Sequence, residues 1–233
     1  MQLPPLVPAI FVDRPNRYLA TVMLDGQPCQ AHVADPGRLR ELLIPGRTVW
    51  LAEAGHPGRK THYDVVLVQQ GEQLVSLDTR LPNAVFVEAI GKGQGMPLPV
   101  ISVRREVRRG DSRLDLQCVD TAGVHWVEIK SVTLVQDGLA LFPDAPTVRG
   151  RRHLLELTDA VCAGEQASVV FVIQRADATR FAPHRAMDPA LADTLIALDA
   201  AAESLTLCMA ASDGWDSEAW DPVWESLRRL NQR

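Results

Sequence analysis

RLDLQCVDTAGVHWVEIKSVT, residues 113–133, is the stretch that decides the fold. Two strand-like segments flank Asp120-Thr121-Ala122-Gly123. Aspartate at the first position and glycine at the fourth are typical of a type I turn. The pattern therefore predicts an antiparallel hairpin with strands Arg113–Val119 and Val124–Thr133.

Charged side chains take matching positions in these two strands. With a tight turn, residue 115 lies opposite residue 128, so Asp115 and Glu128 leave the same face with Cβ atoms about 5 Å apart. Lys130 leaves that face too, because side chains two apart in a strand share a face. Leu114 and Leu116 flank Asp115, and we expect both to point inward into the core.

Two carboxylates this close repel each other unless a cation or a shared proton stabilises them. Oxygen ligands that leave water positions open suit Mg²⁺ or Mn²⁺, so Asp115 and Glu128 are candidate metal ligands. Lys130 would then lie beside the metal, where it can position or deprotonate an attacking water or hold a phosphate oxygen. The same residues are also compatible with a salt-bridge ladder on a solvated sheet face.

The rest of the second half alternates helices with strands. This order predicts a mixed β-sheet with flanking helices, in an α+β fold. The predicted elements are a short helix Ala84–Ile90 capped by Asn83, a strand Ile101–Val107, a helix Arg151–Ala163, a strand Ala167–Ile173, a helix from Asp188-Pro189 to Ala201 and a strand Ser204–Ala210.

The first eighty residues have a different pattern, with short strands and tight turns. Five such strands predict a small N-terminal β-barrel. They are Arg17–Leu24, Gln27–Val33, Thr48–Ala52, Tyr63–Gln69 and Gln73–Leu77. Leu81-Pro82-Asn83 is the expected boundary, which gives domains 1–82 and 83–211 and a Trp-rich acidic extension 212–233. In that extension, Trp220 and Trp224 have helical spacing, which favours packing against the domain or a second copy in a homodimer.

Charge is distributed unevenly along the chain. The net charge is −5, but residues 1–180 carry 20 basic and 20 acidic side chains, so the imbalance lies in the remainder. Local positive fields steer polyanions whatever the net charge, although arginine runs are also common on solvated faces. The candidate nucleic-acid contacts form two arginine clusters: Arg104, Arg105, Arg108, Arg109 and Arg113, and then Arg149, Arg151 and Arg152.

Other features narrow the function classes. The four cysteines are far apart, and the N-terminus resembles neither a signal peptide nor an anchor, so we expect a cytoplasmic protein without a membrane span. G-x-G-x-x-G, P-loop and G-x-S-x-G motifs do not occur. The histidines lack zinc-ligand spacing, and His153 is kept as a possible phosphate contact. Asp144 lies between the Glu-x-Lys strand and the basic helix, where it borders the site or caps the helix.

Several stretches together resemble the sugar fermentation stimulation protein A family. The resemblance spans from about residue 17 to residue 180 and beyond. The matching stretches are RYLATVMLDG (17–26), GRLRELLIPG (37–46), RKTHYD (59–64), PNAVFVEAI (82–90), SRLDLQC (112–118), VEIKSVTL (127–134) and FPDAPTVRGRRHLLEL (142–157). The chain departs from the family pattern at residues 34–37, where Ala-Asp-Pro-Gly replaces Pro-Asn-Thr-Gly.

The resemblance implies an OB-like barrel followed by a restriction-endonuclease-like domain of the PD-(D/E)xK superfamily. Asp115 then takes the place of the motif aspartate, and Glu128 and Lys130 that of the Glu-x-Lys pair. Glu88 matches an acidic residue that many such enzymes add to the catalytic site. The family also implies DNA binding and a link to sugar (maltose) metabolism. From the two arginine clusters we expect contacts mainly with the DNA backbone, with weak sequence specificity. Two functions remain open: a Mg²⁺- or Mn²⁺-dependent nuclease, and a DNA-binding regulator that does not cut.

Overall fold

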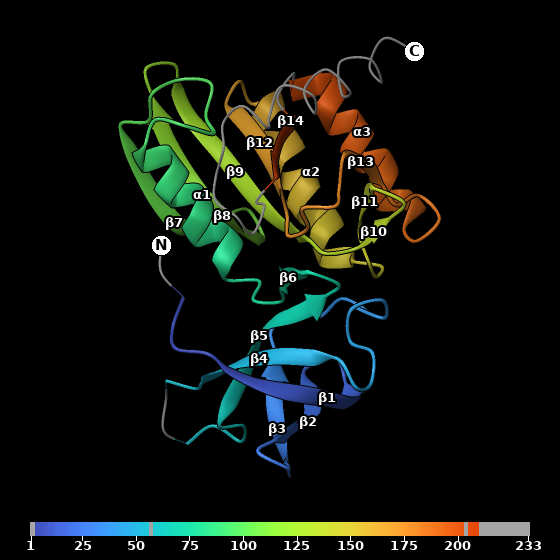
Figure 1. The fold of residues 1–233 in the computed structure, drawn as a ribbon. Helices are drawn as coiled ribbons and strands as arrows, with labels where there is room; N and C mark the ends of the chain where they lie inside the picture. The colour runs from blue at the N-terminus through green and yellow to red at the C-terminus, as the bar shows by residue number, and fades with distance from the viewer. Residues whose placement is uncertain (1–2, 56–57, 203–204, 210–233) are drawn as a thin grey trace.

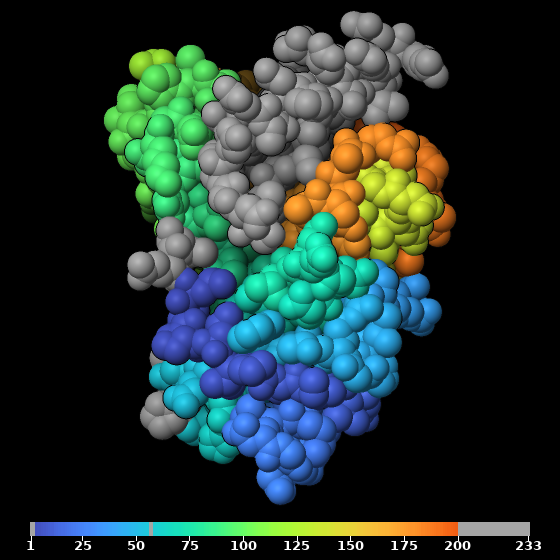
Figure 2. Space-filling model, in the orientation of Figure 1, coloured from blue at the N-terminus to red at the C-terminus, as the bar shows by residue number. Residues whose placement is uncertain are grey.

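The computed structural model describes residues 3–55, 58–202 and 205–209. Two lobes are stacked on each other (Figure 1), with strands β1 to β6 in the lower lobe and the elements from α1 to β14 in the upper lobe. The space-filling view shows the two lobes in contact (Figure 2). Within the described residues, no helix is long and apolar enough to cross a membrane.

The lower lobe is a closed β-barrel. Its sheet has the order β3-β2-β1-β4-β5-β6, and a parallel pairing of β3 with β5 closes the five strands β1 to β5. Alternate residues of each strand fill the interior with aliphatic side chains, among them Val22, Val49 and Val68. The strands are β1 Val7–Asn16, β2 Leu19–Leu24, β3 Gln27–Val33, β4 Thr48–Glu53, β5 Tyr63–Gln70 and β6 Gln73–Ser76.

The predicted barrel is confirmed, but its strands differ from the predicted set. Strand β1 was not predicted, because Pro8 and Pro15 lie in it and proline argues against a strand. Pro8 is tolerated there, opposite Trp50 of β4. The predicted fifth strand, β6, pairs with β5 alone and lies outside the closed ring.

The upper lobe contains a five-stranded mixed sheet of order β14-β12-β9-β8-β7. Strands β7, β8 and β9 are antiparallel, whereas β9, β12 and β14 run parallel. Helix α1 covers one face and α2 with α3 the other (Figure 1). The elements are α1 Leu81–Gly91, β7 Ser102–Arg109, β8 Ser112–Asp120, β9 Gly123–Val132, α2 Val148–Cys162, β12 Gln166–Ile173, α3 Pro189–Ala202 and β14 Leu205–Met209.

The hairpin that opened the sequence analysis forms in the predicted register. Asp120 pairs with Gly123 and Gln117 with Trp126, and the ladder ends at Leu116 and Val127. Leu114 and Leu116 are both fully buried as expected, but on opposite sides of the sheet: Leu114 packs under α2 and α3, whereas Leu116 packs under α1. The strands are distorted here, since Glu106, opposite Asp115 in the β7–β8 register, has a φ of 53°. Asp115 therefore has no paired residue in the β7–β8 register or in the β8–β9 register.

Helix boundaries also differ from the predicted ones. Helix α1 begins three residues earlier than predicted and has Arg80, not Asn83, at its N-cap. Helix α2 begins at Val148, and its cap is Thr147, whose hydroxyl accepts a hydrogen bond from the Gly150 amide at 3.0 Å. A small three-stranded sheet was not predicted, because its strands have only two to four residues: β10 Val135–Gln136, β11 Leu139–Phe142 and β13 Arg180–Pro183. The predicted extension 212–233 lies outside the described residues.

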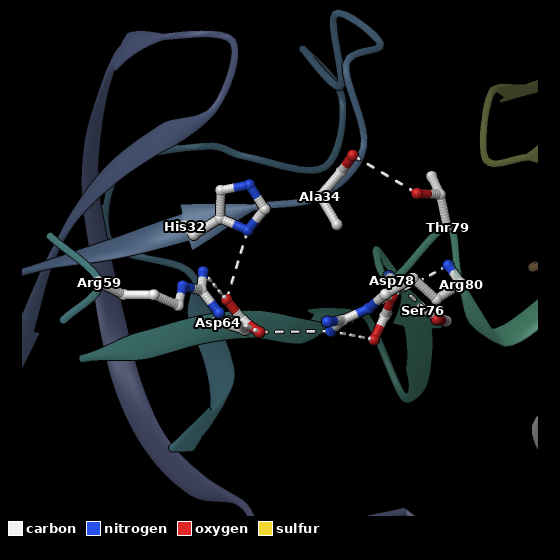
Figure 3. Close-up of polar contacts among 8 residues, drawn as sticks. All are labelled: His32, Ala34, Arg59, Asp64, Ser76, Asp78, Thr79 and Arg80. Atoms are coloured by element: carbon white, nitrogen blue, oxygen red, sulfur yellow. Dashed lines mark hydrogen bonds and ion pairs between the residues drawn. The ribbon is translucent and has the colours of Figure 1, made fainter. Parts of the chain in front are cut away.

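A polar network fastens the connection between the lobes to the barrel (Figure 3). Arg80 binds Asp78 at 2.6 Å and Asp64 at 3.3 Å. Asp64 also accepts a hydrogen bond from Arg59 at 2.6 Å and faces His32 at 3.3 Å. The N-cap residue of α1, Arg80, is thus bound to Asp64 of the barrel, which ties the start of the second domain to the first.

Candidate active site

A cavity of about 810 Å³ opens where the barrel meets the second domain. Its lining comes from segments far apart in the sequence. The barrel contributes Arg17, Tyr18, Asp35 and Gly37, and the second domain contributes Asn83, Arg105, Asp115, Glu128, Lys130, Asp144, Arg149 and His153. The predicted cluster of Asp115, Glu128 and Lys130 therefore lines an interdomain cavity.

Asp115 is held by neutral donors. Its Oδ2 accepts a hydrogen bond from the Ile129 amide at 2.7 Å, and its Oδ1 accepts one from the Asn83 side chain at 2.8 Å. Burial, together with the nearby Glu128 charge, raises the pKa of Asp115 to about 6. Lys130 favours the ionised form of Asp115, but it does not offset burial and the Glu128 charge.

Glu128 is almost fully buried, with 2% of its surface exposed. Its Oε1 accepts hydrogen bonds from Lys130 Nζ and His153 Nδ1. Burial raises the pKa of Glu128, but Lys130 and His153 outweigh burial, so the pKa lies below its ordinary value. The second oxygen, Oε2, is buried without a hydrogen-bond donor. This orphaned oxygen leaves the carboxylate with unused capacity for a ligand.

His153 is positioned from two sides. Its Nδ1 faces Glu128, and its Nε2 lies 3.4 Å from Arg149 Nε, one helical turn away on α2. Because the guanidinium of Arg149 only donates, Nε2 is the acceptor in that contact, which leaves Nδ1 to donate to Glu128. His153 therefore orients Glu128, while the exposed Arg149 stands at the cavity.

A divalent cation fits this donor set. Asp115 and Glu128 supply two oxygen-bearing groups from adjacent strands, one with a raised pKa and one with an orphaned oxygen. Both features are expected where a cation is the missing partner. Among the residues that the structure describes, no group of three or more His, Cys, Asp or Glu side chains is gathered for a metal. Water or a substrate phosphate would have to complete the coordination.

A second pair of carboxylates joins the two lobes on the barrel side of the cavity. Asp144 Oδ2 accepts a hydrogen bond from the Leu39 amide at 2.8 Å, and Asp35 Oδ1 accepts one from the Gly37 amide at 2.7 Å. Burial raises the pKa of Asp35 to about 6, and Asp144 contributes to the rise. A Cβ on Gly37 would lie 2.9 Å from both carboxylates, so glycine permits this close approach.

The predicted arginines separate into different environments. Arg105 and Arg149 line the cavity. Arg109 is engaged inside its own domain, with an ion pair to Glu165 at 2.5 Å and its guanidinium 5.1 Å from the Trp126 ring centroid. Five other arginines are exposed on the surface outside the cavity lining: Arg104, Arg108, Arg113, Arg151 and Arg152.

Glu88 is not brought to the cavity. It lies on α1 and makes an ion pair with Lys92 at 2.9 Å, one helical turn further on. It is absent from the cavity lining. The structure thus unites three of the four residues that the sequence suggested for catalysis.

Sequence reasoning missed three contributors to the cavity. Asn83 was expected as a helix cap but donates to Asp115. His153 was considered only as a phosphate contact, although its spacing with Gly150 and Leu157 places it on the buried face of α2. Asp35 carried no local signal, because its role depends on a contact with the other lobe.

The fold and the cavity together define a class of protein: a five-stranded OB-type barrel joined to a restriction-endonuclease-like domain, with acidic residues of both at their junction. The comparisons name the family. Residues 12–77 match the "SfsA N-terminal OB domain", and residues 80–213 match the "Sugar fermentation stimulation protein RE domain". The chain belongs to the sugar fermentation stimulation protein family.

Individual relatives agree with this assignment. The sugar fermentation stimulation protein homolog of Moorella thermoacetica is 49% identical over 193 residues, covering 82% of this chain and 83% of the relative. The homolog of Desulforamulus reducens is 43% identical, with coverages of 83% and 81%. The structure of Pyrococcus furiosus SfsA in complex with Ca²⁺ is similar with a TM-score of 0.80 and 31% identity, covering 90% of this chain and 89% of that one.

Proposed function

We propose that this protein binds DNA and hydrolyses phosphodiester bonds with a divalent cation held by Asp115 and Glu128. One observation carries the proposal: two carboxylates from adjacent strands line an interdomain cavity, and one of them keeps a buried oxygen without a donor. A purely structural ion pair has no need for such an oxygen, because unsatisfied buried polar atoms cost about 1–3 kcal/mol.

The cation would be Mg²⁺ or Mn²⁺. The related protein of Pyrococcus furiosus was determined in complex with Ca²⁺, another cation that prefers oxygen ligands. A bound divalent cation supplies Lewis acidity and lowers the pKa of water. Asp115 and Glu128 would hold it, and their mutual repulsion would fall as it binds.

The remaining residues act on water and phosphate. Hydrolysis forms a bond from the water oxygen to phosphorus, breaks the bond from phosphorus to one sugar oxygen and returns a proton to that oxygen. Lys130, a compact cation with three donors, holds a non-bridging phosphate oxygen where negative charge develops. His153 keeps Glu128 oriented through Nδ1.

DNA would be held mainly through its phosphates. Arg105 and Arg149 line the cavity beside the carboxylates, and both are exposed. Contacts of this kind position the backbone but carry no sequence information. We therefore expect weak discrimination among DNA sequences.

A second candidate is a DNA-binding regulator of sugar metabolism that does not cut. One observation favours it: Glu128 is already hydrogen-bonded by Lys130 and His153, and the described residues gather no third acidic ligand. Against it, two carboxylates without a cation would repel the DNA that such a regulator must bind.

Cleavage decides between the two candidates. End-labelled single- and double-stranded DNA is incubated with Mg²⁺, with Mn²⁺ and with EDTA, using the wild type and Glu128→Gln. We expect fragments from the wild type only with metal, and at least about 10³-fold slower cutting by Glu128→Gln, which keeps shape but loses charge. If the wild type cuts neither substrate, the regulator is favoured. Equal cutting by both proteins would assign the activity to another site or to a contaminant.

A further inference from the structure

An aromatic side chain on the barrel side of the cavity, Tyr18, bears on whether the cavity takes single- or double-stranded DNA. Tyr18 lies in the two-residue turn between β1 and β2, lines the cavity and keeps 50% of its surface exposed. A half-exposed aromatic ring at the wall of a cavity offers apolar surface that a ligand can bury.

The position of Tyr18 is fixed by the barrel. Its amide donates to Asn16 Oδ1 at 2.9 Å, and its carbonyl accepts from the Val33 amide at 3.0 Å. Its ring stacks on His32 with centroids 6.5 Å apart and planes 12° apart. His32 in turn faces Asp64 at 3.3 Å, which belongs to the network of Figure 3. The ring is therefore a supported platform.

Cations without carboxylate partners accompany this platform. Arg17 places its guanidinium 5.9 Å from the Tyr18 ring centroid, and Arg105 and Arg149 line the opposite domain's part of the cavity. In the part of the chain that the structure describes, none of these three arginines forms an ion pair. Arg109, in contrast, is neutralised by Glu165. Arg17, Arg105 and Arg149 therefore keep their charge available at the cavity, whereas Arg80 and Lys130, which also line it, are paired with carboxylates.

An aromatic platform between arginines suits an unpaired base and its flanking phosphates. Bases stack on aromatic side chains whatever their sequence, provided that their faces are free. In barrels of this class, the loop between the first two strands is one of those that bind oligonucleotides. The ring of Tyr18 lies in that loop.

The size and depth of the cavity favour a single strand at its floor. Glu128 and His153 are only 2% and 3% exposed. A volume of about 810 Å³ suits a ligand of a few nucleotides. A strand whose bases are free of a partner can bring a phosphate to this floor and a base to Tyr18 together.

We infer that the cavity takes single-stranded DNA, with one base stacked on Tyr18 and the adjoining phosphates held by Arg17, Arg105 and Arg149. This inference rests on the proposed function, because it names the substrate form for the same site. It goes beyond that function by assigning the barrel turn a positioning role. Tyr18 does not touch the reacting atoms.

Binding is measured without metal, so that the result does not depend on cleavage. The probe is a 12-nucleotide oligo(dT) strand with 2-aminopurine at its centre, alone or annealed to its complement, in EDTA. We expect the single strand to bind at least tenfold more tightly than the duplex, and its 2-aminopurine fluorescence to be quenched by stacking. Tyr18→Leu should weaken single-strand binding roughly 5- to 150-fold and abolish the quenching, while Tyr18→Phe retains both.

A matched arginine pair tests the phosphate contacts. Arg17→Ala should reduce the slope of log affinity against log salt by about 0.7, the value for one phosphate contact on a single strand. Arg40→Ala, at an exposed barrel position outside the cavity lining, should leave the slope unchanged.

Equal or tighter duplex binding, or quenching that survives in Tyr18→Leu, would overturn the inference even if the protein cuts duplex DNA. Single-strand binding with quenching, in a protein that never cuts, would keep the inference and remove the proposed function. Melting temperatures of all variants are measured alongside, and we expect them to match the wild type because both side chains are exposed.

Discussion

Asp64 in the barrel and Asp115 in the cavity are both shielded aspartates on strands, yet their surroundings are opposite. Asp64 is met by Arg59, Arg80 and His32. Burial raises the pKa of Asp64, but these cations outweigh burial and leave it below its ordinary value. Asp115 is met by a backbone amide and a carboxamide, with Glu128 nearby, and its pKa rises to about 6.

On the proposed function, this difference distinguishes a structural carboxylate from a catalytic one. Asp64 already has cationic partners, which stabilise its ionised form. The pKa of Asp115 is raised by burial and by the Glu128 charge, and a raised pKa of this kind is common at functional sites. Changes at the two residues should therefore have opposite consequences for activity and stability.

The largest expected effect is on cleavage. Asp115→Asn should slow metal-dependent cutting by at least about 10³-fold, because it removes a charged ligand from the site. Asp64→Asn should change the rate by less than about threefold per folded molecule. Both are measured as single-turnover rates in Mn²⁺, with binding recorded separately. An equal loss of cutting rate in the two variants would contradict the proposed difference between Asp115 and Asp64.

The next effect concerns Lys130. If Lys130 only pairs with the buried Glu128 to support the fold, Lys130→Arg keeps that charge and should affect the melting temperature rather than the cutting rate. In the proposed site Lys130→Arg should reduce cutting by about 10²-fold, since the planar guanidinium of arginine cannot replace the compact ammonium of lysine beside Glu128. Lys130→Ala is compared in the same assay, with melting temperature as the measure of folding. Full activity of Lys130→Arg would indicate that Lys130 supports the fold and takes no part in cutting.

The next prediction concerns the stability of the protein when the barrel carboxylate Asp64 is changed. Asp64→Asn should lower the free energy of unfolding by about 1–2 kcal/mol, a moderate value because Arg59 and Arg80 retain much of their solvent contact. Urea denaturation in EDTA provides the measurement. A more stable variant would show that the network of Figure 3 does not support the fold.

The smallest effect is a pH dependence. A carboxyl whose pKa is higher in the folded state stabilises the fold below its unfolded pKa, about 3.9, and this contribution is lost as pH rises through about 6. The side chain in Asp115→Asn does not ionise, so the variant keeps this contribution at high pH. We expect the free energy of unfolding of the variant to exceed that of the wild type by about 1 kcal/mol at pH 8 and to equal it at pH 4. Denaturation at the two pH values without metal tests the sign. A gain that is larger at pH 4 would contradict the raised pKa of Asp115.

Local patterns predicted the hairpin and much of the site. Asp120 and Gly123 fix the turn, and strand parity then puts Asp115, Glu128 and Lys130 at one cavity. Strand β1 was missed because its prolines conceal a strand that only the closed barrel stabilises. Contacts between distant segments could not be predicted either.

Two such contacts complete the cavity. The hydrogen bond from Leu39 to Asp144 joins residues 105 positions apart, and the contact of His153 with Glu128 joins residues 25 apart. The helical spacing of His153 predicts that it is buried, but no local pattern predicts the partner of either residue. Both depend on how the two domains and the helix layer pack, which is decided by the whole fold.

Calorimetric titration of Mn²⁺ tests the central claim most directly, because it asks whether the cavity carboxylates lack a cation. At pH 7.5 the wild type and Asp64→Asn should each bind Mn²⁺, and Asp115→Asn should bind it at least about tenfold more weakly, since it loses a charged oxygen ligand. No binding by the wild type, or equal binding by Asp115→Asn, would contradict the account.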